Sequence, residues 1–200
     1  MACYLLGLWL GRRRGHLLAE DGKKHIQGLL ELPRLMEKTL EIEPQVAEMA
    51  RELSRYKNFL FLARGIHYPV ALEGALKLKE LSYAHAEGYP AGEMKHGPIA
   101  LIDETMPVVV LAPRDGTYDR MMSTIEEVRA RDGRVFAFGH EGDRELAAKS
   151  QAMIAVPSAG DLLSPMLMAI PLQLLSYHVA VRLGRDVDQP RNLAKSVTVE

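Results

Sequence analysis

The sequence predicts an α/β protein with a doubly wound, mostly parallel sheet flanked by helices, preceded by an N-terminal helical segment. Two observations support this prediction. Short runs of apolar residues recur without polar alternation, which is typical of strands buried on both faces. Longer stretches with helical spacing separate these runs, and strands that alternate with helices indicate parallel βαβ units with right-handed crossovers.

Three helices are expected before the first strand. Residues 3–14 are mostly apolar up to a run of three arginines, and a glycine follows them, as at many helix C-termini. Apolar positions at helical spacing continue over 23–38, where Pro33 is expected to interrupt or restart the helix. Pro44 suits the first turn of a third helix that runs to about residue 55.

The remaining chain alternates between the two kinds of element. Strands are expected at 58–63, 108–112, 135–138 and 153–156, with a weaker candidate at 85–89. Helices are expected at 69–83, 118–131 and 162–183. Ligands of such sheets bind beyond the carboxyl ends of the strands. The loops at 64–68, 88–97, 113–117 and 139–143 are therefore the first places to look for chemistry.

The composition excludes several classes of protein. The chain has 25 basic and 26 acidic residues and a net charge of -1, whereas a nucleic-acid-binding protein needs a basic stripe. Its one cysteine, Cys3, forms no intrachain disulfide. The apolar segment 2–10 is too short to span a bilayer and lacks a preceding basic region. We therefore expect a cytoplasmic protein without a membrane or nucleic-acid partner.

No spacing of His, Cys, Asp and Glu suggests a zinc or calcium site, so no metal is expected. The phosphate-binding glycine motifs of nucleotide-binding proteins are also absent from the sequence. No cofactor is therefore expected.

One predicted helix carries a group of charges on one face. Glu73, Lys77 and Glu80 are spaced i, i+4 and i+7, so two carboxylates and an amine project together. On spacing alone, a solvated face with weak ion pairing is the commoner interpretation of such a triad. The alternative is a site for proton transfer.

Two further candidates lie outside the predicted helices. His96 sits in a loop between glycines, and histidine changes charge near neutral pH. Lys195 lies in a partly apolar C-terminal tail, where a lysine of lowered pKa could attack a carbonyl. Taken singly, a loop histidine or a tail lysine is more often an exposed residue than a catalyst. The same expectation applies to His67, His85 and His178.

Three long strings, taken together, resemble one family. They are A-L-E-G-A-L-K-L-K-E-L-S-Y at 71–83, H-A-E-G-Y-P-A-G-E-M-K-H-G-P at 85–98 and D-V-D-Q-P-R-N-L-A-K-S-V-T-V-E at 186–200. These strings resemble those of glutamine–fructose-6-phosphate aminotransferase (isomerising), in the same order. Shorter matches at 31–37 and 61–65 extend the resemblance over nearly the whole chain.

The resemblance implies a sugar-isomerase (SIS) type of fold and a place in a larger enzyme. Enzymes of this family have a glutaminase domain followed by two SIS subdomains, and they convert fructose 6-phosphate and glutamine nitrogen into glucosamine 6-phosphate. This chain resembles the second SIS subdomain, with helices that leave the first. The implied sections are a helical remnant or linker at 1–55, a SIS domain at 56–185 and a catalytic tail at 186–200. A phosphosugar substrate and a homodimer are implied as well.

The resemblance also implies roles for individual residues. Glu80 resembles the base that moves a proton between C1 and C2 of the sugar, and Lys195 the lysine that forms a Schiff base with the open ketose. His96 resembles the ring-opening histidine, which in the family reaches the site of a neighbouring subunit. Lys77 and Glu73 resemble a supporting pair.

One departure from the family pattern limits what this chain is expected to do alone. The family binds the sugar phosphate in a Ser/Thr-rich loop of the first SIS subdomain, and this sequence has no such loop and no glutaminase domain. We therefore expect a truncated form that is a poor or inactive synthase unless another polypeptide supplies these parts. The alternative is a non-catalytic SIS module that binds a phosphosugar or has a regulatory role.

Overall fold

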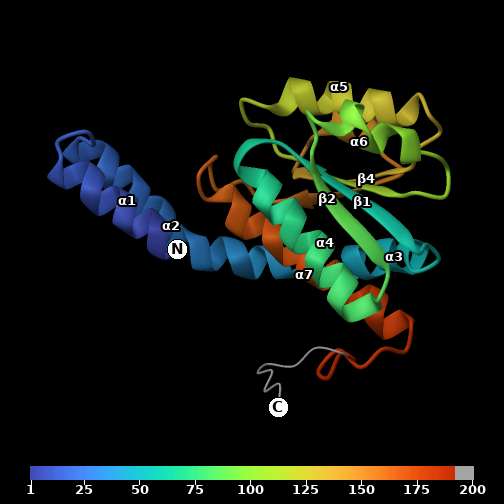
Figure 1. Ribbon diagram of the computed structural model, residues 1–200. Coiled ribbons are helices and arrows are strands. Elements are labelled where there is room, and N and C mark those ends of the chain that lie inside the picture. Colours follow the sequence, from blue (N-terminus) through green and yellow to red (C-terminus); the bar gives the residue numbers. More distant parts are fainter. Residues whose placement is uncertain (192–200) are drawn as a thin grey trace, which may run out of the picture.

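A five-stranded parallel sheet forms the centre of the protein and has helices on both faces (Figure 1). The computed structural model describes residues 1–191. The strand order is β2-β1-β3-β4-β5. The strands are β1 (Asn58–Ala63), β2 (His85–Pro90), β3 (Val108–Ala112), β4 (Val135–His140) and β5 (Ala152–Val156). The predicted fold class is confirmed, including the weak candidate that became β2.

The helices follow the predicted order with small differences at their ends. They are α1 (Ala2–Arg13), α2 (Ala19–Leu40), α3 (Glu43–Leu53), α4 (Tyr68–Ser82), α5 (Tyr118–Arg129), α6 (Arg144–Ala148) and α7 (Ser164–Arg182). The sequence did not predict α6, because its five residues are too few to show helical periodicity. Short 3-10 turns follow β1 and β2.

Alternate residues of the strands pack into two separate cores. On one face, Phe59 and Phe61 of β1 pack with apolar side chains of α3, α4 and α7. On the other face, Leu60 and Leu62 pack with α5 and α6. This two-sided burial explains why the strands read as continuous apolar runs. Close approach of α4 to α7 depends on Gly74, where an added Cβ would lie 2.7 Å from Leu172 Cδ1.

The strand order changes direction between β1 and β3. From β1 the chain crosses to β2 on one side, and β3 then pairs with the other side of β1. Because the sheet is parallel, α4 runs from the carboxyl end of β1 back toward the amino end of β2. The two ends of α4 therefore lie at opposite edges of the sheet.

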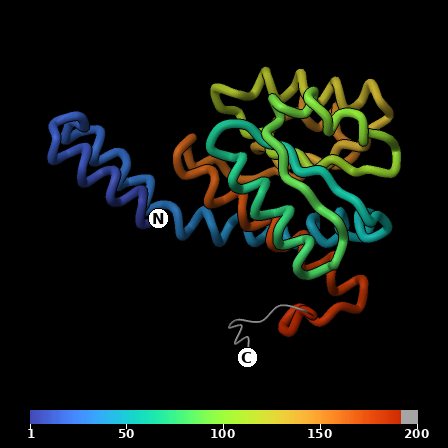
Figure 2. The backbone as a smooth tube through the Cα atoms, in the orientation of Figure 1, coloured from blue at the N-terminus to red at the C-terminus, as the bar shows by residue number. Residues whose placement is uncertain are grey.

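An arm formed by α1 and the first half of α2 projects from the α/β body (Figure 2). The prediction that Pro33 interrupts the second helix is wrong, since α2 runs through it to Leu40. Pro33 removes one backbone hydrogen bond, but the neighbouring Leu32 is buried in the core and holds this part of the helix against the body.

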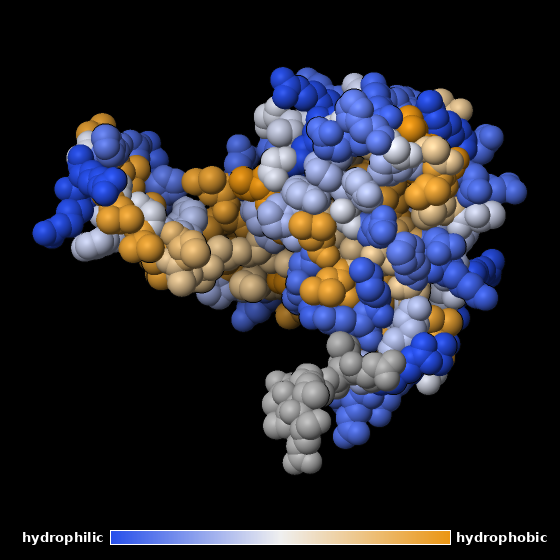
Figure 3. All heavy atoms as spheres, in the orientation of Figure 1, coloured by the Kyte–Doolittle hydropathy of each residue, from blue (hydrophilic) through white to orange (hydrophobic). Residues whose placement is uncertain are grey.

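The arm leaves large apolar side chains exposed. In α1 no residue is buried, and the exposed fractions of Leu6 and Trp9 are 54% and 57%. The space-filling view shows orange and tan residues along the arm and where it joins the body (Figure 3). An exposed apolar surface of this kind is typical of an interaction site.

One helix of the described residues, α7, is long and apolar enough to cross a membrane by length and composition alone. Half of the relevant window is buried inside the protein, where α7 packs against α3 and α4. The same apolar character is what a central core helix requires.

Candidate active site

The charged face of α4 is confirmed. Lys77 Nζ lies 2.7 Å from Glu80 Oε2 and 3.8 Å from Glu73 Oε1. The three side chains are between 26% and 43% exposed, with Glu80 the least. Neighbouring positions on α4 such as Ala75 and Leu78 are buried in the core, which fixes the rotation of the helix and turns the charged face outward.

The hydrogen bond to Glu80 is the main reason why the pKa of the Lys77 amine is raised, and the charges of Glu80 and Glu73 add to it against the effect of burial. Lys77 is therefore held as an ammonium ion beside two carboxylates. The four principal cavities of residues 1–191 are lined by other residues. The face thus offers acid–base groups on an open surface, and other protein has to enclose them before they can exclude water.

The described start of the tail contacts the residue that follows α4. Tyr83 follows α4 directly and adopts a left-handed conformation with φ of 64°. Its hydroxyl accepts a hydrogen bond of 2.9 Å from the backbone N–H of Arg191, and the Arg191 guanidinium lies 4.2 Å from the ring centre. The start of the tail is therefore fixed about one helical turn beyond Glu80. Lys195 itself lies outside the described residues.

His96 lies far from Glu80 within the same chain. It belongs to a 3-10 turn after β2, its side chain is 74% exposed, and Glu93 is 3.9 Å away. The turn depends on Gly97, whose φ of 151° is rarely open to other residues. Glu80 is near the amino end of β2 and His96 beyond its carboxyl end, so the strand separates them by about 17 Å. The structure brings together Glu73, Lys77 and Glu80, but not His96.

A different polar group occupies the carboxyl edge of the sheet. His67 lies between Ser164 and Asp115, with 3.1 Å from Nε2 to Ser164 Oγ and 3.4 Å from Nδ1 to Asp115 Oδ2. The expectation that His67 is exposed is wrong, because it is 1% exposed. Its position just after β1 places it under the start of α7. Burial lowers the pKa of His67, so the ring is neutral near pH 7.

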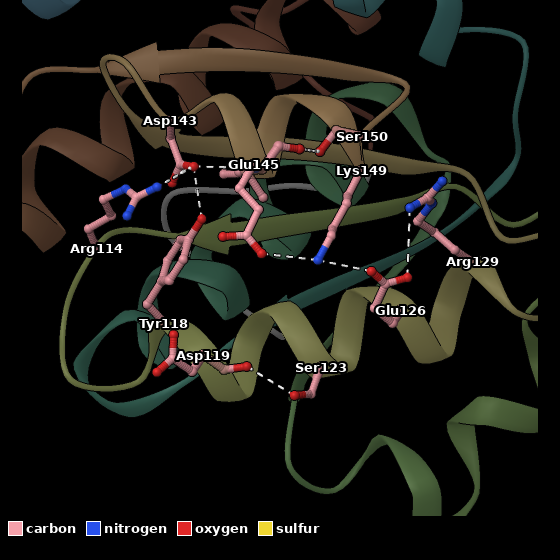
Figure 4. A network of polar contacts seen from close by, with 11 residues as sticks. Arg114, Tyr118, Asp119, Ser123, Glu126, Arg129, Asp143, Glu145, Lys149 and Ser150 are labelled. Carbon is pink, nitrogen blue, oxygen red and sulfur yellow. Dashed lines mark hydrogen bonds and ion pairs between the residues drawn. The ribbon is translucent and has the colours of Figure 1, made fainter.

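Asp143 is the centre of a second network at this edge (Figure 4). Its Oδ1 accepts hydrogen bonds from Tyr118 Oη and Arg114 Nη2, each 2.8 Å, and one of 3.1 Å from the backbone N–H of Leu146. Burial opposes its ionisation, but these three hydrogen bonds outweigh that effect and lower the pKa of Asp143. Asp143 thereby caps α6 and ties three segments together.

Sequence reasoning pointed to the loops at 64–68, 113–117 and 139–143 but did not single out the polar residues that form these two networks. Asp143 stands directly before α6 and carried an N-cap signal, but the helix it caps was not predicted. Ser164 and Asp115 carried no signal of their own, because their partner His67 is 97 residues from one and 48 from the other. His85 and His178 remain peripheral to both groups. They pair with Glu87 at 3.4 Å and with Glu43 at 3.0 Å.

The chain matches a known domain family and several known proteins. The model of the SIS domain family matches residues 52–183. Glutamine–fructose-6-phosphate aminotransferase [isomerizing] of Thermus thermophilus is 56% identical over 199 residues, which are 100% of this chain and 33% of that protein. The protein of the same name from Aquifex aeolicus is 55% identical over 91% of this chain and 31% of its own length. The chain thus spans about a third of the length of these relatives.

A solved structure has the same fold. The C-terminal domain of glucosamine-fructose-6-phosphate aminotransferase from Francisella tularensis matches with a TM-score of 0.88 and 38% identity. The match covers 92% of this chain and 52% of that one. Almost half of that solved domain therefore has no counterpart here.

Proposed function

The chain belongs to the SIS domain family, and from this premise we propose that it is the isomerase portion of a glutamine–fructose-6-phosphate aminotransferase. In this proposal it acts in a cytoplasmic homodimer that converts fructose 6-phosphate and glutamine-derived ammonia into glucosamine 6-phosphate. Residues 1–55 link it to a preceding section, 56–185 are its SIS domain and 186–200 its catalytic tail. High identity over the whole chain to enzymes of that name supports the proposal.

The proposed chemistry centres on Glu80. Isomerisation of a C2 imine to an aldose amine removes a proton from C1 and places one on C2, with no net oxidation. A single carboxylate that can swing between two neighbouring carbons suits this transfer. Lys77 donates a hydrogen bond to Glu80, which orients the carboxylate, and Glu73 is the second carboxylate near the ammonium ion.

Lys195 is proposed to form the Schiff base with the open ketose, with loss of water, and ammonia then replaces the lysine nitrogen at C2, which releases the Lys195 amine. The observation that carries this proposal is the contact of the Arg191 backbone with Tyr83, three residues beyond Glu80. Lys195 is four residues further, and four residues span at most about 14 Å. An amine on this tail is therefore within reach of the Glu80 carboxylate.

His96 is proposed to open the sugar ring in the active site of a neighbouring subunit. The strand length between His96 and Glu80 supports a role in trans, since the two groups cannot meet on one sugar within the same chain. The 74% exposure of the side chain leaves it available to a second copy.

The sugar phosphate is proposed to bind to protein that precedes this section. Among residues 1–191, α4 carries no cluster of Ser and Thr on its charged face, and the exposed apolar arm provides a surface for a preceding domain. Positioning contributes about 7–11 kcal/mol to catalysis in well-oriented reactions. We therefore expect no measurable synthesis from this chain alone.

A chimeric enzyme tests the proposal. The chain would replace the matching last third of the Thermus thermophilus relative, and glucosamine 6-phosphate would be measured with fructose 6-phosphate and glutamine as substrates. The chimera should be active, its Glu80→Gln variant should lose at least about a hundredfold in kcat, and the matched surface variant Lys79→Gln should retain activity. A folded chimera that binds substrate without turnover would refute the assignment.

The open surface around Glu80 favours a second candidate function, a non-catalytic module that binds phosphosugars. Such a module should bind fructose 6-phosphate as an isolated chain at least tenfold more tightly than inorganic phosphate. Calorimetric titration of both ligands decides this. Equal affinities would remove the module as an explanation.

A further inference from the structure

A small pocket lies where three helices end. Its volume is about 270 Å³, and it is formed at the C-terminal ends of α3, α4 and α7 and the start of β1. Its charged lining residues are four cations, Arg55, Lys57, Arg185 and Arg191, and none of its lining residues is a carboxylate. It is separate from the charged face of α4, whose three residues do not line it.

The helix ends do not account for all of this positive charge. Each helix C-terminus carries about half a negative charge, so three of them supply about -1.5. Four cations leave an excess of about +2.5 in a concave site. Compensation of helix dipoles therefore explains part of the cluster but not the whole of it.

The guanidinium groups of Arg185 and Arg191 contact an aromatic ring, which leaves their N–H groups available to a ligand. Arg185 and Arg191 lie 5.1 Å and 4.2 Å from the centre of the Tyr83 ring. Contact with an aromatic face engages the plane of a guanidinium but not its N–H groups. Within residues 1–191, no ion pair involves any of the four cations.

A neighbouring groove differs from this pocket in the ion pairing of its cations. That groove also carries basic residues, among them Arg129, Arg134 and Lys149. Lys149 lies 2.9 Å from Glu126, which also pairs with Arg129 at 3.7 Å (Figure 4). Arg134 lies 2.8 Å from Glu52. Arg55 and Lys57 line both sites. The three cations that line only the groove are thus paired with carboxylates, whereas Arg185 and Arg191, which line only the pocket, have no such pair within residues 1–191.

We propose that this pocket binds a phosphate monoester. A dianionic phosphate matches the excess charge, and the forked N–H groups of Arg185 and Arg191 suit two phosphate oxygens each. The ring of Tyr56 lines the same pocket and offers a surface for a small organic group. The volume is near the lower end for ligand pockets, about 300 Å³, which favours a small metabolite over a nucleotide. The proposal does not depend on the proposed function.

Titration calorimetry of the whole chain at low salt tests this site. The probes are inorganic phosphate and glycerol 3-phosphate, which carries a phosphate monoester but no hexose. Glycerol 3-phosphate should bind at least as tightly as inorganic phosphate. Arg185→Gln and Arg191→Gln should each weaken binding about tenfold, as expected for loss of one charge-assisted contact. Arg129→Gln, in the neighbouring groove, should leave the Kd within twofold.

Three controls keep the result interpretable. Thermal unfolding of each variant shows that the fold is retained, and Arg191, in an irregular segment, gives a second variant should Arg185→Gln disturb α7. Glu80→Gln should bind both probes as the unchanged chain does, which separates this site from the proposed active site. No saturable binding, or an equal loss in Arg129→Gln, would overturn the proposal and leave only general attraction of anions.

Discussion

The two edges of the sheet use polar residues in opposite ways. At the carboxyl edge, His67 and Asp143 are buried and contact other residues of the same domain. Toward the amino edge, Lys77 and Glu80 pair on a partly exposed surface, and the cations around Tyr83 have no acidic partner within residues 1–191. Ordinarily the carboxyl edge holds the ligand of such a sheet. Here the buried polar groups of that edge contact one another within the domain, and the proposed acid–base face of α4 lies toward the other edge.

The largest effect is expected on activity, at His96 and Lys195, which are proposed to act in one site from different subunits. In the chimera, His96→Ala and Lys195→Ala should each lower activity at least about a hundredfold. Random mixing of the two inactive forms should restore about a quarter of the unmodified activity, because half of the dimers are mixed and each has one intact site. Activity assays after mixing at equal concentration measure this. Absence of any recovery would place both groups in one subunit and contradict the trans role of His96.

The next largest effect is a loss of stability, expected at the carboxyl edge of the sheet. Asp143→Asn removes a charge that three donors share, and we expect it to cost about 2 kcal/mol of unfolding free energy. For a chain of this size that lowers Tm by roughly 4–8 °C. Urea unfolding and thermal melts measure the change. Asp119→Asn, on the surface of α5, is the matched control and should change stability little. If the Asp143→Asn variant were as stable as the unmodified chain, this network would not stabilise the fold.

The buried histidines of the carboxyl edge should also make stability depend on pH. Burial lowers the pKa of both His67 and His140 below the ordinary value of about 6.5. The unfolded chain then binds more protons than the folded one below pH 6.5, so stability is complete above that pH and is lost as pH falls. Unfolding free energies from pH 8 to 5 should fall, and the slope should be smaller in His67→Asn. An identical slope would remove His67 as the cause.

The smallest stability effect is expected where the proposed catalytic effect is largest. Glu80→Gln breaks a partly exposed ion pair, and such pairs contribute about 0.5 kcal/mol or less. Urea unfolding of this variant should therefore differ little from that of the unmodified chain. A loss of 2 kcal/mol or more would make Glu80 a structural residue like Asp143 and erase the contrast between the two edges.

The sequence alone determined the fold class and the charged face of α4. Strands buried on both faces have to be apolar at every position, and a helix has to place residues i, i+4 and i+7 on one side, so both features are visible without coordinates. The three strings of residues also indicated the family that the chain resembles. The strands and the charged face depend on neighbouring residues, and the resemblance depends on strings that occur in the same order along the chain.

Only the tertiary structure decided which of these groups meet. The contact of His67 with Ser164 joins residues 97 positions apart, and that of Tyr83 with Arg191 joins residues 108 positions apart. No periodicity encodes such pairs, because they arise when the crossover connections bring loops and helix ends to a common edge of the sheet. The continuity of α2 through Pro33 was decided in the same way, since burial of Leu32 outweighs the local preference for a break.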